Sequence, residues 1–352
     1  MPVSRRRVLA GLAGLPLGGC APVRAPVMTF SPEPLRVRSP APWKAGLGEL
    51  DDVDPELRVA FSDARGFALL PPPGPRGWRT LRPEPPQTVA EFRDSGPNAR
   101  LTPRDRIAVL PLGEFPLEVT ADYKFVSIVR TPELSAIAAV LAAFFATPVD
   151  VLTREQFPEA HMPRRVAHGR FQYDARALLD RVAVRLPGSA HSMLTLVNVD
   201  LFVWPEQQYA FGWSTLRNRL GVAGFSRLDP GVHGGVALDD PGPVLLRRGL
   251  RAAVHEVGHM FGLGHCQVFR CAMNGISDHE ELDASPLRLC PLCLRKLHLV
   301  TDLDPRARDA ALQRVFDDLG LVEESRWIAE RTRSLWPAES PAGRSLSRSG
   351  PR

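Results

Sequence analysis

The residues best suited to chemistry lie close together, in the stretch HEVGHMFGLGHCQVFRCAM at positions 255–273. His255 and His259 are four residues apart, so a helix would place both imidazoles on one face, where they could chelate one zinc ion. Gly262 would let the chain turn sharply after this helix, and His265 could then approach the same ion. The spacing predicts a three-histidine zinc site. The alternative is a solvated helix with incidental histidines.

Glu256 would stand beside this metal without binding it. Three histidines leave one zinc position for water, whose pKa zinc lowers from about 15.7 to near 7. Glu256 could take the proton of that water and hand it to a leaving amine. We therefore expect peptide-bond hydrolysis without a covalent enzyme intermediate, and the sequence contains no GxSxG motif of a serine hydrolase. The alternative is a zinc-stabilised peptide-binding or scaffold lipoprotein with little turnover, although a purely structural site has no need of Glu256.

Four cysteines follow closely, at Cys266, Cys271, Cys290 and Cys293. Two such pairs are typical of a tetrahedral thiolate zinc site. The alternative is two disulfides, which an oxidising compartment would permit, but cysteines separated by two residues rarely bridge each other. Cys266 directly follows His265 and one peptide step spans about 3.8 Å, so this site would also fix the third histidine. We expect two Zn²⁺ ions per chain, one catalytic and one structural.

The elements that must position these residues can be read from the hydrophobic pattern. An apolar stripe recurs at helical spacing over residues 244–261, which predicts the helix that carries the two histidines. Upstream, β-rich runs are found at 106–113, 125–129, 149–152, 193–202, 209–213 and 222–228, and helical patterns at 132–148, 174–184 and 305–335. This alternation predicts an α/β (α+β) fold with a mixed twisted sheet backed by helices.

The first twenty residues have the order of an export signal. Arg5, Arg6 and Arg7 precede a short apolar stretch that ends at Cys20, as in a bacterial lipoprotein signal with a twin-arginine start. The alternative is an arginine-rich tail with a chance cysteine. The export interpretation predicts lipidation at Cys20 and a protein anchored at a bacterial membrane, facing the periplasm or the cell exterior. Without export the protein would be cytoplasmic.

Composition limits the possible partners. The 44 Lys and Arg residues against 39 Asp and Glu leave a net charge of +5, spread along the chain, which gives no case for a nucleic-acid surface. No apolar run reaches the roughly 18 residues that span a bilayer. We expect a monomer whose partner is a peptide or protein substrate and whose membrane contact is limited to the N-terminal lipid.

The expected domain organisation has five parts. Residues 1–20 form the signal peptide and residues 21–76 a proline-rich extension, because 15 of the first 80 residues after Cys20 are proline, against 35 in the whole chain. A peptidase domain would span residues 77–300. A helical extension at 301–336 and a disordered Ser/Pro/Arg-rich tail at 337–352 would follow.

The motifs together resemble one family. The run HEVGHMFGLGHC, then CAM and CPLC, resembles the archaemetzincins, a metzincin-clan family of zinc-dependent peptidases. The resemblance includes RIAVLPLGEF, the stretch 195–228 and the segment 77–95, and so covers about residues 77–300. It implies a metzincin-like fold and Met273 in a Met-turn beneath the metal, although the pattern alone also fits an ordinary core methionine. It further implies the zinc-binding and catalytic residues given above.

Two features of the activity stay open at this level. The resemblance does not decide between an aminopeptidase and an endopeptidase. Some metzincins stabilise the oxyanion with a tyrosine beyond the Met-turn, but Tyr123, Tyr173 and Tyr209 all precede the motif. We therefore expect the metal and a donor from an edge strand near residues 208–228 to stabilise that charge.

Overall fold

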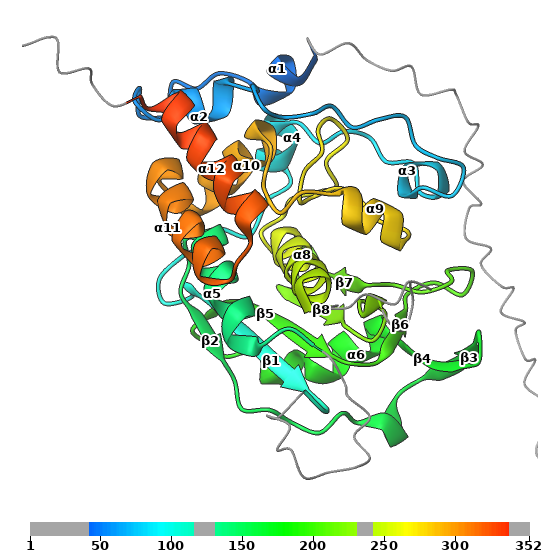
Figure 1. The fold of residues 1–352 in the computed structure, drawn as a ribbon. Helices are drawn as coiled ribbons and strands as arrows, with labels where there is room; N and C mark the ends of the chain where they lie inside the picture. The colour runs from blue at the N-terminus through cyan, green and yellow to red at the C-terminus, as the bar shows by residue number, and fades with distance from the viewer. Residues whose placement is uncertain (1–41, 116–130, 231–241, 338–352) are drawn as a thin grey trace, which may run out of the picture. The chain divides into compact units, whose positions relative to one another are not determined.

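The central sheet has five strands and includes an antiparallel edge. Its order is β2 (Val149–Val151), β1 (Arg106–Leu112), β5 (Ala190–Val197), β8 (Leu220–Gly224) and β7 (Gly212–Ser214), as Figure 1 shows. The first four strands run parallel, and β7 pairs antiparallel with β8. The structure is a computed structural model that describes residues 42–115, 131–230 and 242–337.

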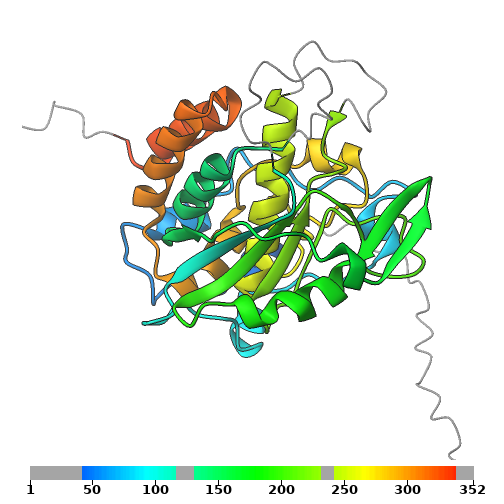
Figure 2. The ribbon, with the colours of Figure 1, turned by 90° about the horizontal axis from the view of Figure 1, so that it is seen from below.

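Both faces of this sheet are covered by helices. Ile107 and Val109 of β1 belong to one apolar cluster and Ala108 and Leu110 to another, because successive strand side chains point to opposite faces. Helices α5 (Leu134–Phe145) and α8 (Gly242–Met260) cover the first face, and α6 (Ala175–Val182) covers the second (Figure 2). Burial on both faces explains why the parallel strands are nearly continuous apolar runs. The predicted α/β fold with a mixed sheet is confirmed.

A second sheet contains three short strands, β3 (Arg164–Ala167), β4 (Arg170–Asp174) and β6 (Asp200–Phe202). The sequence pattern predicted one strand over residues 193–202, whereas β5 ends at Val197 and β6 pairs with β4 in the other sheet. The turn between them places the Asp200 carboxylate 2.5 Å from Arg227, in a buried ion pair. A continuous strand would not bring this carboxylate to its partner.

Helix α8 confirms the helix predicted over 244–261, and the chain then turns as expected. Gly262 has a φ of +93°, which favours glycine. Its amide donates to the His259 carbonyl at 2.8 Å, and the Leu263 amide donates to the Gly258 carbonyl at 3.1 Å. These bonds satisfy the last carbonyls of the helix and reverse the chain direction toward His265.

The N-terminal part of the described chain packs on the C-terminal part. Helices α1 (Pro42–Leu47), α2 (Arg58–Ser62), α3 (Trp78–Leu81) and α4 (Val89–Asp94) are four to six residues long, as the prolines predicted. Trp43 and Phe61 from this part are buried in the same apolar cluster as Phe316 and Ile328 near the other end. The two parts therefore stabilise each other across a large sequence separation.

Four helices complete the C-terminal part: α9 (His279–Ala284), α10 (Pro291–Thr301), α11 (Pro305–Asp318) and α12 (Val322–Leu335). The helical pattern over 305–335 is thus divided between α11 and α12, which pack against each other and, through α11, against α5. Figure 1 shows this group beside the sheet.

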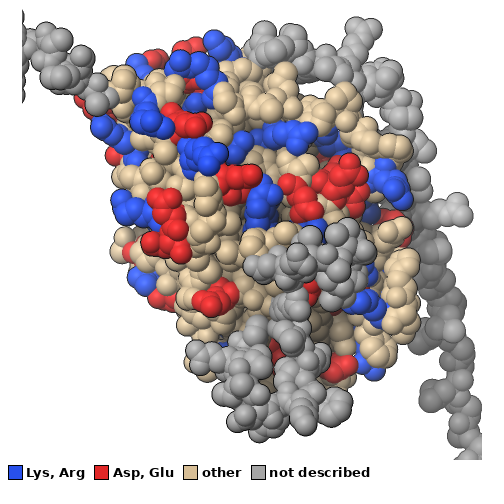
Figure 3. Space-filling view, in the orientation of Figure 1, with Lys and Arg blue, Asp and Glu red and all other residues tan. Residues whose placement is uncertain are grey.

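Several sequence-based predictions fall outside the described residues. They are the signal peptide with Cys20, the β-rich run at 125–129 and the tail from residue 338. Within the described ranges, no helix combines the length and apolar character needed to cross a membrane. On the face seen in Figure 3, basic and acidic side chains lie interspersed.

Candidate active site and metal centres

The three predicted histidines converge in the structure. Helix α8 places His255 and His259 one turn apart, with their Nε2 atoms separated by 3.0 Å. After the turn at Gly262, the ring of His265 lies 5.3 Å from that of His255 and 4.7 Å from that of His259, measured between centroids. One ligand atom from each ring lies within 4.8 Å of the other two. We call this group the three-histidine site.

The outer nitrogens of these rings all have acceptors. The Nδ1–H of His255 donates to the Ala272 carbonyl at 2.9 Å, and that of His259 donates to the Leu263 carbonyl at 2.7 Å. The Nδ1 atom of His265 lies 2.6 Å from Oε2 of Glu84. Each bond fixes the tautomer and leaves an Nε2 lone pair facing the shared centre.

Burial favours the neutral form of the two histidines on helix α8. It holds the pKa of His255 well below its usual range and lowers the pKa of His259 to about 3, and the neighbouring rings add to both effects. Neutral imidazoles that converge through one nitrogen each are the donors that zinc binds. The geometry of the site therefore fits the predicted metal, and the neutral forms of His255 and His259 agree with it.

Glu256 lies beside the site and is almost fully buried. Its Oε2 accepts a hydrogen bond of 2.6 Å from the hydroxyl of Ser214 on β7. Gly212 of the same strand lets the sheet edge approach, because a Cβ there would overlap the Glu256 carboxylate. Burial raises the pKa of Glu256 to about 8 in the metal-free site, and the positive charge of a bound zinc ion would lower it again and favour the carboxylate. This carboxyl is thus held beside the imidazoles by the edge strand.

Met273 lies beneath helix α8, where its sulfur packs against the backbone at Gly258. It is fully buried, and its carbonyl accepts a hydrogen bond of 2.7 Å from the Cys266 amide. Met273 therefore packs against the helix that carries two of the histidines, while its role in a Met-turn beneath the metal stays a prediction. The same contacts also make Met273 part of the apolar core.

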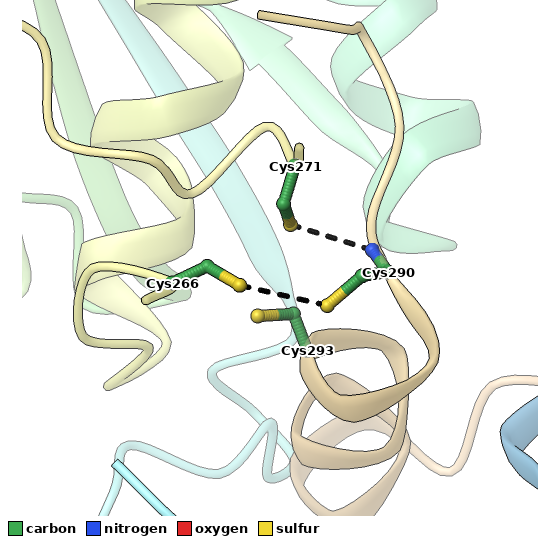
Figure 4. A group of neighbouring side chains, drawn as sticks. All are labelled: Cys266, Cys271, Cys290 and Cys293. Carbon is green, nitrogen blue, oxygen red and sulfur yellow. Dashed lines mark hydrogen bonds between the residues drawn. The ribbon is translucent and has the colours of Figure 1, made fainter. Parts of the chain in front are cut away.

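The four predicted cysteines form a second cluster, which we call the four-cysteine site. Figure 4 shows the side chains of Cys266, Cys271, Cys290 and Cys293 pointing toward one another. Their sulfurs lie within 4.8 Å of one another, and all four residues are buried. The sulfurs of Cys266 and Cys290 are 3.7 Å apart, well beyond the roughly 2.05 Å of a disulfide. Four converging thiols without a bridge fit a tetrahedral metal better than two disulfides.

Asn274 holds the loop of this cluster in place. The sequence did not predict this role. Its amide group donates to the carbonyls of Cys266 and Phe269, at 2.8 and 2.9 Å, and its oxygen accepts from the Cys271 amide at 2.8 Å. Its buried polar atoms therefore hold the loop between the first two cysteines. The available signal was an asparagine directly after the Cys-Ala-Met run, since asparagine often closes tight turns.

The two sites share one loop. His265 and Cys266 are adjacent, and the Ala272 carbonyl that orients His255 directly follows Cys271. A distortion at the cysteines would therefore reach two of the three histidines through one or two peptide units.

Three further residues of the site had no recognisable sequence signal. Glu84 belongs to the proline-rich PEPP run, 181 residues before its partner His265. Trp78 packs edge-on against the His265 ring, with centroids 4.9 Å apart. Ser214 lies within the predicted edge region 208–228, but its direction toward Glu256 depends on strand register.

The remaining histidines lie outside this site. His191 is buried, with Nε2 at 3.1 Å from the Asn98 carbonyl, and His298 bonds to the Leu303 carbonyl. His161 and His168 are exposed, and His279 contacts the Arg227 carbonyl. His233 lies outside the described residues.

A cavity of 320 Å³ opens beside the three-histidine site. Its wall includes Glu256 and Ser214 and is otherwise rich in aromatic side chains, among them Trp204, Phe211 and Trp213. A volume of this order accommodates one or two amino-acid side chains. A mostly apolar cavity with a few polar groups at one end is the usual form of a substrate site.

Known proteins resemble this chain over the same region. The family model for Peptidase family M54 matches residues 239–299. Archaemetzincin-2 from Pongo abelii is 26% identical over 288 residues, which cover 74% of this chain and 78% of the relative. An archaemetzincin from Natronomonas pharaonis is 32% identical over 129 residues, 37% of this chain and 73% of the relative. The crystal structure of archaemetzincin from Methanopyrus kandleri aligns with a TM-score of 0.42 and 26% identity, covering 56% of this chain and 96% of that one.

Proposed function

The chain belongs to the archaemetzincin family and is a zinc metallopeptidase, and from this premise we propose that it hydrolyses peptide bonds at the three-histidine site. His255, His259 and His265 would bind the catalytic ion. The observation that carries this proposal is the convergence of three Nε2 atoms whose rings are each held by an acceptor at Nδ1. A bound zinc ion would polarise the substrate carbonyl and make water a nucleophile near neutral pH.

Glu256 is the proton carrier in this proposal. It would remove a proton from the attacking water and deliver it to the amine nitrogen as the peptide C–N bond breaks. The hydrogen bond from Ser214 holds one carboxylate oxygen, so the other can face the reacting atoms. Ser214 thereby positions the carboxylate, while β7 presents the edge of the sheet along the cavity.

The four-cysteine site would hold a second, structural zinc ion, which gives two ions per chain. Four buried sulfurs, the shared loop and the hydrogen bonds of Asn274 support this assignment. In this role the ion would keep His265 and the Ala272 carbonyl in place. The three histidines line the cavity, so a chelator should remove an ion bound there before one bound at the buried cysteines.

We propose the location of the enzyme from its first twenty residues alone. An arginine start, a short apolar stretch and Cys20 support export and lipid attachment at a bacterial membrane. The folded part would then act as a monomer on peptides or proteins outside the cytoplasm. Labelling with a fatty-acid analogue, compared between wild type and Cys20→Ser, tests this location.

A peptide library tests the activity. We expect wild type to cleave it, and Glu256→Gln to lose about 10²- to 10⁴-fold in rate while keeping about two zinc ions, because this substitution removes the base but no ligand. Equal inactivity of both proteins with zinc bound would instead support a peptide-binding or scaffold role. The new termini in the products separate aminopeptidase from endopeptidase cleavage.

A further inference from the structure

Helix α8 carries three arginines before the first histidine, and only two of them have acidic partners. Arg247 lies 2.6 Å from Glu324, and Arg248 lies 2.6 Å from Asp283. Arg251 forms no ion pair with any carboxylate in the described part of the chain. Its Nη1 donates to the Pro286 carbonyl at 3.3 Å, while Nε and Nη2 are buried without a hydrogen-bond partner.

The position of Arg251 relates it to the active site. It precedes His255 by one helical turn and so lies on the same side of α8. The residue is 1% exposed and lies between two cavities: it lines the one beside the three-histidine site, whose wall also includes Ala252, Ile276 and Leu282, and a second one that Arg248 and Asp283 line. Burial lowers the pKa of Arg251 to about 9, so the guanidinium remains charged at neutral pH. Cys271, Asp283 and Glu324 lie near enough to favour this charge, but none of them forms a direct ion pair with Arg251.

Burying a guanidinium without a counter-charge is energetically costly. Other buried arginines of this protein avoid that cost, since Arg227 pairs with Asp200, Arg295 with Asp52 and Arg308 with Asp309. Nε and Nη2 of Arg251 have almost no accessible surface. After a rotation of the side chain toward the cavity, a carboxylate there could bond to Nε and Nη2 together, which is the geometry in which arginine binds carboxylates best.

We propose that Arg251 forms a carboxylate-binding subsite in the cavity wall, which selects peptides with an Asp or Glu side chain, or a free C-terminus, beside the cleaved bond. This inference rests on the proposed peptidase function. The apolar neighbours of Arg251 would contact the methylene groups of such a residue. They would also strengthen the charge interaction by excluding water.

Paired peptides test this specificity. Each pair differs only in Glu against Gln at one position near the cleaved bond, or in a C-terminal acid against the amide. We expect wild type to cleave the charged member with a kcat/KM about 10- to 100-fold higher at one position. The pair that shows the preference distinguishes a side-chain carboxylate from a terminal one. Equal rates within every pair would overturn the proposal.

Three variants link the preference to this side chain. Arg251→Met removes the guanidinium but fills the buried space, and we expect the ratio of kcat/KM between the charged and the neutral member of the pair to fall to about one. Arg251→Lys keeps the charge without the paired donors, so part of the preference should remain. Arg248→Met is the matched control on the same helix and should keep the full preference. An unchanged preference in Arg251→Met would contradict the proposal.

Binding provides a measurement that does not depend on turnover. Calorimetry with full-length Glu256→Gln, before and after chelation, gives the affinity for each peptide pair. Tighter binding of charged peptides that is lost in the double variant with Arg251→Met supports the subsite, even if wild type cleaves nothing and the proposed function fails. Cleavage of peptides without any charge preference in rate or affinity would instead retain the peptidase and reject the subsite.

Discussion

The three-histidine site and the four-cysteine site are neighbours with different kinds of support. All cysteine ligands and their organising residue Asn274 come from positions 266–293, and the cluster is buried. The histidines face a cavity, and one of them is held by Glu84, 181 residues away in the sequence. The difference suggests that the cysteine site is a local structure, whereas the histidine site is completed by distant segments.

Substitution of one cysteine should have the largest effect, because the four-cysteine site and the three-histidine site share a loop. We expect Cys290→Ser to lose the structural zinc ion, to lower the free energy of unfolding by about 3 kcal/mol or more, and to reduce kcat/KM at least about tenfold through displacement of His265. Metal analysis, chemical unfolding and peptide cleavage measure the three effects. Cys20→Ser is the control and should change none of them. Full zinc content and full rate in Cys290→Ser would show that the sites are independent.

Substitution of Glu84 should affect the three-histidine site without affecting the four-cysteine site. We expect Glu84→Ala to weaken zinc binding at the three-histidine site by about 10- to 100-fold, because His265 loses the acceptor for its Nδ1–H. The four-cysteine site should keep its ion. Glu84→Gln should lose less, since an amide oxygen still accepts the bond.

Chelator competition measures this change in affinity. Glu91→Gln is the matched control, because Glu91 lies in the same segment but caps helix α4. An unchanged zinc affinity in Glu84→Ala would mean that the hydrogen bond from His265 to Glu84 does not contribute to zinc binding.

The smallest expected effect concerns the base rather than the ligands. Ser214→Ala removes the hydrogen bond to Glu256, so the carboxylate becomes less well oriented, and we expect kcat/KM to fall about three- to tenfold with zinc content unchanged. Thr215→Ala is the control, since its hydroxyl bonds to the Leu220 carbonyl on the neighbouring strand. Equal kcat/KM values for Ser214→Ala and Thr215→Ala would show that Ser214 does not position Glu256.

The ligands could be predicted from the sequence because their geometry is local. Two histidines one turn apart, a glycine turn and closely spaced cysteines fix most of the relative positions of seven side chains. The helix at 244–261 and strand β1 were predictable for a similar reason, since their apolar patterns reflect burial along a single element.

The missed features depend on tertiary contacts. No local pattern indicates that Glu84 meets His265 or that Ser214 faces Glu256, since both contacts require a particular packing or strand register. The division of residues 193–202 between two sheets was missed for the same reason, because it involves the pairing of β6 with β4 and the ion pair between Asp200 and Arg227. Arg251 shows the same limit, because three arginines on one helix look alike until their neighbours are known.

The hydrogen bond between Glu84 and His265 also means that the active site is completed late during synthesis of the chain. Glu84 leaves the ribosome long before His265, and Cys290 and Cys293 follow later still. A partly synthesised chain therefore lacks the third imidazole and the sulfurs that steady it. Under the proposed function, hydrolysis therefore requires synthesis at least as far as Cys293, and shorter nascent chains would be protected from their own active site.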